Sequence, residues 1–379
     1  VLQASGPNAL GIIRSLARAK IPVVATDHDP GALGLRSRYA AAHVLPDPIA
    51  EPVSFVDGLL QLGERIGERP VLFATHDDAL SAIGPREAEV DALFRRPWSP
   101  WQTLEPILDK SHQHAVARRI GFPIPETFEP AGAAELEQII DHLRFPVVLK
   151  PREQAAFRAR VRAQVLEADG PDELRRRFSE AESFRLQISE VIPGGDERLW
   201  TLGSYRNADG VPIGSFTGHK LRQWPPRFGT ARSAEAGWDP ELAMRCHALL
   251  DALDYHGISQ VEVKRDPRDG RDVLIEVNPR SWLWISLATA VGVNLPALCF
   301  SDALGLATRP RLGHRSGKRW TLAAKHLVAS PREIRRGQWT ATQFARSIRP
   351  PIVDGVIDPR DPRPTLAMLE RRTGRLRRG

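Results

Sequence analysis

The chain has only two cysteines among its 379 residues, Cys246 and Cys299. They lie far apart, and neither belongs to a CxxC pair or to a Cys/His spacing typical of zinc ligands. The sequence therefore supports neither a disulfide framework nor a zinc module, and a reducing cytoplasm is the expected location. Internal repeats and low-complexity segments are also absent, and 42% hydrophobic content is enough to build buried cores.

Long apolar runs are nearly absent as well. Residues 1–20 lack a basic start, a continuous apolar run and a small-residue cleavage site, so we expect no secretory signal. Residues 282–300 carry no charge and are about long enough to span a bilayer. This stretch is interrupted by polar and helix-breaking residues, namely Ser286, Thr289, Gly292, Asn294 and Pro296. We therefore expect a buried helix there and no membrane partner.

Lysine is scarce, since only seven of the 53 basic residues are lysine and the other 46 are arginine. The basic residues are concentrated in residues 311–379, which carry 17 basic and 5 acidic side chains, a formal charge of +12. The preceding 310 residues carry −5. A basic tail can contact nucleic acid, anionic lipid or an acidic partner, but no RNA-binding signature accompanies this one. We favour a solvated, arginine-rich surface and expect no nucleic-acid partner.

The first 105 residues alternate apolar runs with an amphipathic stretch. Strands are expected at residues 1–4, 22–26 and 71–75, with a helix at residues 8–19. This order favours a parallel sheet covered by helices. Gly6 and Gly11 lie where a nucleotide phosphate could meet a helix N-terminus, but their spacing matches neither GxGxxG nor a Walker A loop. A degenerate Rossmann-like domain is favoured over a nicotinamide-binding one, in which Asp27 would hold the ribose.

Residues 97–106 contain three prolines and two tryptophans and mark a boundary, beyond which the pattern predicts an α+β body built mainly on antiparallel hairpins. The turn residues Asn207 to Gly210 give a strong hairpin signal. Helices are expected at residues 108–120 and 241–253, and strands at residues 145–149, 184–191, 199–205, 211–217, 258–264 and 273–277.

The last two predicted strands carry the strongest chemical signal. Side chains alternate along a strand, so Gln260, Glu262 and Lys264 share one face, and Glu276 and Asn278 share another. If residues 266–270 form a hairpin turn, these polar faces lie side by side. Two carboxylates and an amide oxygen are the hard ligands that Mg²⁺ takes when phosphates complete its shell, and Arg280 follows to hold a phosphate or carboxylate. The alternative is a solvent-facing polar sheet.

Three more residues are candidates for nucleotide contacts. Lys150 ends an apolar strand and could present its ammonium into a cleft, although a lysine at a strand end more often reaches into solvent. Glu190 and Glu197 flank a Pro-Gly-Gly turn, an arrangement that can offer a backbone hinge to adenine and a carboxylate to ribose. Without further context, the more common interpretation of such a segment is a polar turn with no binding role.

A series of motifs in order resembles the ATP-grasp superfamily, near D-aspartate ligase and the ATP domain of the carbamoyl-phosphate synthase large chain. The resemblance covers residues 1–310 and rests on Asp109-Lys110, Gly121 to Thr127, Pro146 to Pro151, Glu190 to Gly194, Gln260 to Glu262 and Glu276 to Arg280. It implies a Rossmann-like pre-ATP-grasp domain followed by a two-subdomain ATP-grasp fold and a basic C-terminal extension, an α/β plus α+β architecture. The implied boundaries are 1–105, 106–187, 188–310 and 311–379.

The resemblance also implies roles for the residues that carry it. ATP and Mg²⁺ are the expected cofactors, with Mn²⁺ as an alternative metal. The implied ATP contacts are Lys110 and Lys150 at the phosphates, Glu190, Val191 and Ile192 at adenine, and Glu197 at ribose. The implied metal ligands are Glu262, Glu276 and Asn278, with Arg280 at the reacting phosphate or carboxylate.

Three further residues and one loop complete the comparison with the family. Lys220 and Arg222 follow a hairpin strand that could point at the same phosphates, and Arg227 is a looser candidate for a substrate carboxylate, although all three could equally lie in solvent. The family usually has a mobile glycine-rich loop after the second lysine. Here residues 152–160 contain no glycine, so either arginines replace the backbone donors or turnover is impaired.

The implied activity is ATP-dependent, ADP-forming ligation of a small-molecule carboxylate to an amine through an acyl phosphate, which agrees with the lack of a nucleophilic triad. A proton acceptor for the amine could be His76 or His219, although each is more often structural. Three alternatives remain: an enzyme forming carbamoyl or carboxy phosphate, a nicotinamide-dependent enzyme, and a non-catalytic ATP-binding regulator. The oligomeric state is open, with a homodimer among the alternatives.

Overall fold

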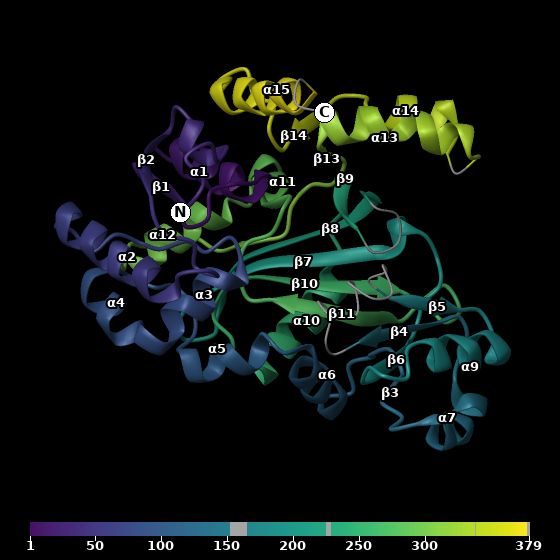
Figure 1. The fold of residues 1–379 in the computed structure, drawn as a ribbon. Coiled ribbons are helices and arrows are strands. Elements are labelled where there is room, and N and C mark those ends of the chain that lie inside the picture. The colour runs from purple at the N-terminus through teal and green to yellow at the C-terminus, as the bar shows by residue number, and fades with distance from the viewer. Residues whose placement is uncertain (152–164, 225–228, 338, 377–379) are drawn as a thin grey trace. The chain divides into compact units, whose positions relative to one another are not determined.

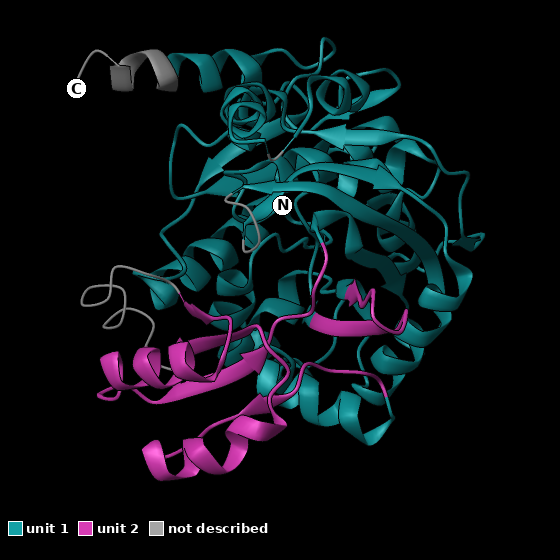
Figure 2. Ribbon diagram, turned by 90° about the vertical axis from the view of Figure 1, so that its right-hand side faces the viewer, with its two compact units in different colours: residues 1–121, 195–263, 276–379 teal, residues 122–194, 264–275 magenta. Residues whose placement is uncertain are grey.

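We describe the chain from a computed structural model, which covers residues 1–151, 165–224, 229–337 and 339–376, with side chains to residue 370. Contacts between Cα atoms divide the chain into two compact units, coloured separately in Figure 2. The first unit contains Val1–Gly121, Gly195–Val263 and Glu276–Gly379, and the second contains Phe122–Gly194 and Lys264–Ile275.

The first unit contains most of the helices, which Figure 1 labels. They are α1 (Pro7–Arg18), α2 (Pro52–Ile66), α3 (Asp77–Ile83), α4 (Glu87–Leu93), α5 (Trp101–Ile107), α6 (Lys110–Arg119), α10 (Pro240–Ala252), α11 (Ile285–Ala290), α12 (Leu295–Ala303), α13 (Ala323–Arg335), α14 (Ala341–Ser347) and α15 (Arg363–Leu376). The predicted helices at 8–19, 108–120 and 241–253 are confirmed as α1, α6 and α10, with shifted ends.

The N-terminal region contains a two-stranded parallel sheet of β1 (Val23–Asp27) and β2 (Ala40–Val44). The strand predicted at 22–26 is therefore confirmed, but those at 1–4 and 71–75 are wrong, because neither segment forms a ladder. Residues 71–75 make one isolated bridge, from Val71 to Arg95. Two carbonyls of this segment accept hydrogen bonds from the N-terminal residues: Phe73 O accepts from Leu2 N, and Thr75 O accepts from the Asn8 side chain.

An eight-stranded sheet carries the polar residues predicted to bind metal. Its strands follow the order β11-β10-β7-β8-β9-β13-β14, and β12 pairs with β8. They are β7 (Leu199–Arg206), β8 (Pro212–Trp224), β9 (Thr230–Ala236), β10 (Gly257–Arg265), β11 (Asp272–Asn278), β12 (Arg311–Leu312), β13 (Arg319–Thr321) and β14 (Ile352–Asp354). β7 and β8 pair antiparallel around the predicted turn, where Gly210 has a φ of 74°.

β10 and β11 are neighbours in this sheet, which confirms the predicted hairpin. Asp266 closes their turn, because its N–H donates to Arg271 O and its carbonyl accepts from Gly270 N. Gly270 has a φ of 76°, a left-handed conformation that glycine adopts without strain. The hairpin therefore fixes which residues of the two strands face the same side.

The apolar stretch at 282–300 contains two short helices, α11 and α12, where the sequence predicted a single buried helix. They are separated at Gly292, whose φ of 97° breaks the helical path. Trp282 and Trp284 nevertheless lie in the core, so the expected burial is confirmed. Within the ranges that the structure describes, none of the helices has the length and apolar character needed to cross a bilayer.

The C-terminal residues contribute to the same sheet. β13 pairs with β9 on one side and β14 on the other, and Trp320 on β13 is fully buried in the main core. Beyond β14, the buried carboxylate of Asp361 accepts hydrogen bonds from Arg14 and Ser37 of the N-terminal region. Residues 319–361 therefore pack into the first unit by strand pairing and by buried polar contacts.

The second unit has a four-stranded sheet of order β3-β6-β4-β5. Its strands are β3 (Thr127–Phe128), β4 (Val147–Pro151), β5 (Leu166–Ala168) and β6 (Leu186–Glu190), and its helices are α7 (Ala133–Ile139) and α9 (Pro171–Glu180). β4 and β6 confirm the strands predicted at 145–149 and 184–191. Leu149 and Ile188 pair across the sheet and lie in this unit's own apolar core.

Candidate active site

Two carboxylates and two amides form one hydrogen-bonded array on β10 and β11. Gln260 Nε2 donates to Glu262 Oε1 at 2.8 Å, and Gln260 Oε1 accepts from Asn278 Nδ2 at 3.3 Å. Asn278 Nδ2 also lies 3.2 Å from Glu276 Oε1. Alternation along each strand places these residues on one face, and the hairpin brings the two faces together. The three predicted metal ligands are therefore adjacent.

Each carboxylate of this array is paired with a lysine from elsewhere in the first unit. Lys220 on β8 places its Nζ 2.8 Å from Glu262 Oε2, and both side chains are about nine-tenths buried. Lys110, the first residue of α6, places its Nζ 2.6 Å from Glu276 Oε2, and 59% of its side chain is exposed. Two negative charges thus face two positive charges.

The ion pairs strongly favour the charged form of Glu276. Burial alone would raise its pKa, but the charge of Lys110, hydrogen bonds from Lys110 and Asn278, and the charge of Lys220 outweigh burial. The pKa of Glu276 is consequently well below its ordinary value. The carboxylate remains ionised at any pH at which the protein would work, as a metal ligand must.

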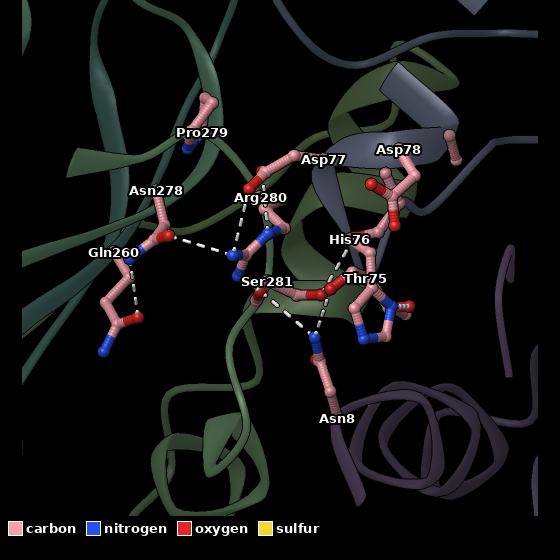
Figure 3. A network of polar contacts seen from close by, with 12 residues as sticks. Asn8, Thr75, His76, Asp77, Asp78, Gln260, Asn278, Pro279, Arg280 and Ser281 are labelled. Atoms are coloured by element: carbon pink, nitrogen blue, oxygen red, sulfur yellow. Dashed lines mark hydrogen bonds and ion pairs between the residues drawn. The ribbon is translucent and has the colours of Figure 1, made fainter. Parts of the chain in front are cut away.

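Arg280 connects the array to the N-terminal region. Its Nη2 donates to Asn278 Oδ1 at 2.9 Å, and its Nε donates to Asp77 Oδ1 at 2.8 Å. Asp77 is the first residue of α3, and Figure 3 shows the guanidinium between Asn278 and Asp77. The sequence predicted Arg280 but assigned no role to Asp77, because only the tertiary fold brings residues 203 positions apart together.

The donor set fits Mg²⁺. Glu262, Glu276 and Asn278 offer hard carboxylate and amide oxygens, and no sulfur or imidazole lies among them. Within the described ranges no cluster of three or more His, Cys, Asp or Glu residues could hold a metal by itself. A magnesium ion held mainly by two carboxylates and completed by phosphate oxygens needs no such cluster.

Arg222 lies on β8 two residues after Lys220, but the structure does not bring it to the array. The pairing of β8 with β9 shifts register between Lys220 and Arg222, so Leu221 is an extra residue that reverses the alternation. The Arg222 guanidinium instead lies over the ring of Trp339, 4.8 Å from its centroid. This bulge gave no signal in the sequence.

Four of the predicted nucleotide-binding residues belong to the second unit. Lys150 lies on β4, opposite Gln187 of β6. Glu190 ends β6, and its carboxylate accepts from Arg268, while Val191 N donates to Pro146 O and Ile192 is buried. In the first unit, the Glu197 carboxylate lies against Gly195. Arg227 and the loop at 152–160 lie outside the described residues.

No known protein-family profile matches the chain. The D-aspartate ligase of Enterococcus faecium (strain Aus0004) is 25% identical to it over 320 residues, which are 80% of this chain and 76% of that enzyme. Among solved structures, the biotin carboxylase–β,γ-ATP complex of Campylobacter jejuni has a TM-score of 0.61 and 17% identity, covering 84% of this chain and 73% of that one.

A second solved structure, the L-amino acid ligase of Bacillus licheniformis, has a TM-score of 0.58 and 18% identity over 81% of this chain and 74% of that one. These structural similarities show a shared fold, and the sequence similarity to D-aspartate ligase agrees with the motifs on β10 and β11. The chain thus has the ATP-grasp fold and resembles, in sequence and in motifs, the carboxylate-amine ligase branch of that superfamily.

Proposed function

We propose that the chain is an ATP-dependent, ADP-forming ligase that joins a small carboxylate to an amine through an acyl phosphate. One observation carries the proposal: Glu262 and Glu276 lie on one sheet face, linked by two amides, and each is paired with a lysine. The similarity to D-aspartate ligase supports the same class of reaction.

The charges of this array match those of a metal–polyphosphate. Two carboxylates and two ammonium groups neutralise one another when no ligand is bound, which limits the cost of keeping the buried pair charged. With Mg²⁺–ATP bound, Glu262 and Glu276 would hold the metal, and Lys110 and Lys220 would pair with phosphate oxygens instead. Each of the four groups would then exchange one opposite charge for another, so none would be left uncompensated.

The proposed roles follow from these positions. Glu262, Glu276 and Asn278 would hold Mg²⁺, which when bound supplies charge neutralisation at the transferring phosphate. Arg280, with two guanidinium nitrogens already directed at carboxylate and amide oxygens, would orient the reacting carboxylate. Positioning and charge stabilisation therefore account for catalysis, and the protein forms no covalent bond to the substrate.

The remaining ATP contacts are proposed for residues named by motif. Lys150 would contact phosphates, Glu190, Val191 and Ile192 adenine, and Glu197 ribose, in keeping with the order in which these motifs follow one another. We further propose that the acceptor is a small amine, that nucleic acid is not a partner and that a homodimer is a candidate assembly. D-aspartate is the first carboxylate to test, because a relative is a D-aspartate ligase.

The test is ADP release by the purified protein with Mg²⁺ and ATP, against D-aspartate and a panel of other amino acids, each with an amine pool. The pool contains ammonium, glycinamide and dipeptides, and bicarbonate is assayed separately. We expect ADP only when a particular carboxylate is present, and a loss of at least about 100-fold in Glu276→Gln.

Two results would contradict the ligase. ADP released with bicarbonate alone, without any amino acid, would favour the carboxy-phosphate alternative. ATP binding by the wild-type protein with no ADP from any carboxylate would favour the non-catalytic regulator. Glu68→Gln, at an exposed residue of the first unit outside every motif, serves as the matched charge-neutralising control and should release ADP like wild type.

A further inference from the structure

His76 lies directly before α3, and its neighbours define which ring nitrogen carries the proton. Thr75 Oγ1 lies 3.0 Å from Leu2 O and 2.9 Å from Gln3 O, so its single proton is donated to these carbonyls. The same oxygen lies 2.8 Å from His76 Nδ1 and must accept there. Nδ1 therefore carries the proton in the neutral ring, and Nε2 keeps its lone pair.

His76 immediately precedes Asp77, the residue that links α3 to the proposed site. The next residue, Asp77, binds Arg280 through two hydrogen bonds of 2.8 and 3.3 Å, and Arg280 in turn binds Asn278. Figure 3 shows Asp77 beside this guanidinium, with His76 directly before it at the start of the same helix and its ring on the side of Thr75. Half-buried His76 has no protein donor at Nε2 within the ranges described.

Burial, assisted by the charge of Arg280, favours the neutral form of this ring. Burial and the positive charge of Arg280 lower the pKa of His76, while Asp78, Asp77 and Asp27 act in the opposite direction. The net shift is downward, so the unprotonated ring predominates at neutral pH. A neutral imidazole with a fixed tautomer and an open Nε2 has the properties of a general base.

We propose that His76 is a further catalytic residue, the base that takes a proton from the attacking amine. This inference rests on the proposed ligase activity and assigns the amine to the side of the site formed by α3. Asp77 and Asp78 are the adjacent carboxylates, a fitting environment for a nitrogen that becomes positively charged as it attacks.

The step balances as follows. The neutral amine attacks the acyl carbon, forming the C–N bond, and its nitrogen becomes positively charged. The C–O bond to phosphate breaks and its electron pair leaves with the phosphate. The proton on nitrogen passes to His76 Nε2, and the half-buried imidazolium then releases it to solvent.

The test separates the two half-reactions in His76→Asn. The asparagine amide can replace Nδ1–H as a donor to Thr75 Oγ1, so the variant keeps the local contact and removes only Nε2. Hydroxylamine is weakly basic, stays unprotonated at neutral pH and traps acyl phosphates as hydroxamates without a base. Reactions contain ATP, Mg²⁺ and D-aspartate or the active carboxylate, with either hydroxylamine or the amine pool. His28→Asn, at a half-exposed ring, is the matched control.

We expect His76→Asn to form hydroxamate at close to the wild-type rate and to form amide at least about 100-fold more slowly. The wild-type amide rate should fall as the pH drops through the lowered pKa of His76, and that acidic decline should be missing in the variant. His28→Asn should match wild type in both reactions.

Three outcomes would overturn the role of His76. They are equal amide rates in variant and wild type, equal losses of hydroxamate and amide in the variant, and a wild-type protein that forms hydroxamate but accepts none of the amines. A wild-type protein that forms neither hydroxamate nor ADP contradicts the ligase itself, so failure of the two proposals can be told apart.

Discussion

The two lysines that pair with the array differ in burial, and this difference determines what each ion pair contributes to stability. Lys220 and Glu262 are both about nine-tenths buried, whereas Lys110 is 59% exposed. An exposed ion pair is worth little because water screens it. Removing one partner of a buried pair is costly, since the other charge stays behind without compensation.

We therefore expect Lys220→Met to lower the free energy of unfolding by about 3–5 kcal/mol and Lys110→Met to lower it by less, because water screens the exposed ammonium. Mg²⁺ should restore stability to Lys220→Met more than it stabilises wild type, because the metal replaces the missing charge at Glu262. Urea unfolding with and without MgCl₂ measures both effects. Equal losses in the two variants, with no response to Mg²⁺, would contradict this account.

Glu276 gives a prediction on acid stability. Because its folded pKa lies below its ordinary value, it contributes stability above the unfolded pKa, about 4.3, that is lost as the pH falls further. Glu276→Gln should therefore flatten the dependence of unfolding free energy on pH below about 4.3. Urea unfolding at a series of acidic pH values measures the slope, and identical slopes in variant and wild type would refute the prediction.

At the scale of elements, helix α13 places His326 in buried surroundings that disfavour protonation of its ring. Ser347 Oγ donates its proton to Phe344 O, so it must accept from His326 Nε2, which lies 2.8 Å away. The other ring nitrogen, His326 Nδ1, is buried and has no hydrogen-bond partner among the described residues. Burial, with the charges of Arg232 and Arg222, lowers the pKa of His326 to about 4. The unfolded chain therefore binds this proton first as the pH falls.

Neutral His326 makes its full contribution to the free energy of unfolding above about pH 6.5. That contribution is lost as the pH falls toward 4, by about 3 kcal/mol in total. The ring centroids of His326 and Trp339 are 5.3 Å apart, so His326→Phe keeps an aromatic ring in this contact. The phenyl ring cannot bind a proton. We expect its unfolding free energy to fall less than that of wild type between pH 7 and 4 in matched urea titrations. A parallel decline in both proteins would show that His326 is not the source.

At the scale of the whole first unit, residues 319–361 join distant parts of the chain. Trp320 is fully buried in the main core, and Asp361 binds Arg14 across 347 positions of sequence. The Arg14 guanidinium is itself buried, so loss of Asp361 leaves a positive charge in the interior.

We expect Trp320→Ala and Asp361→Ala each to lower the free energy of unfolding by about 3–5 kcal/mol. Arg349→Ala, at an exposed arginine of the same segment, should stay within about 0.5 kcal/mol of wild type. Denaturant unfolding of the full chain tests all three variants. If the segment were a detachable basic tail, all three would unfold like wild type.

Much of the site followed from local pattern. Alternation along two short strands placed Glu262, Glu276 and Asn278 on one face, and the turn at 266–270 predicted that the strands pair. These inferences need only the two-residue period of a strand and the backbone preferences of turn residues, both of which act over a few positions. The same is true of α1, α6 and α10.

The tertiary structure alone decided which distant residues meet the array. Strand propensity at 71–75 was overridden because carbonyls there accept from Leu2 and Asn8, and a bulge of one residue turned Arg222 away from Lys220. The contact of Asp77 with Arg280 likewise joins residues that no local pattern relates. Periodicity is a property of neighbouring residues, whereas register shifts and long-range pairings depend on how whole elements compete for the same partners.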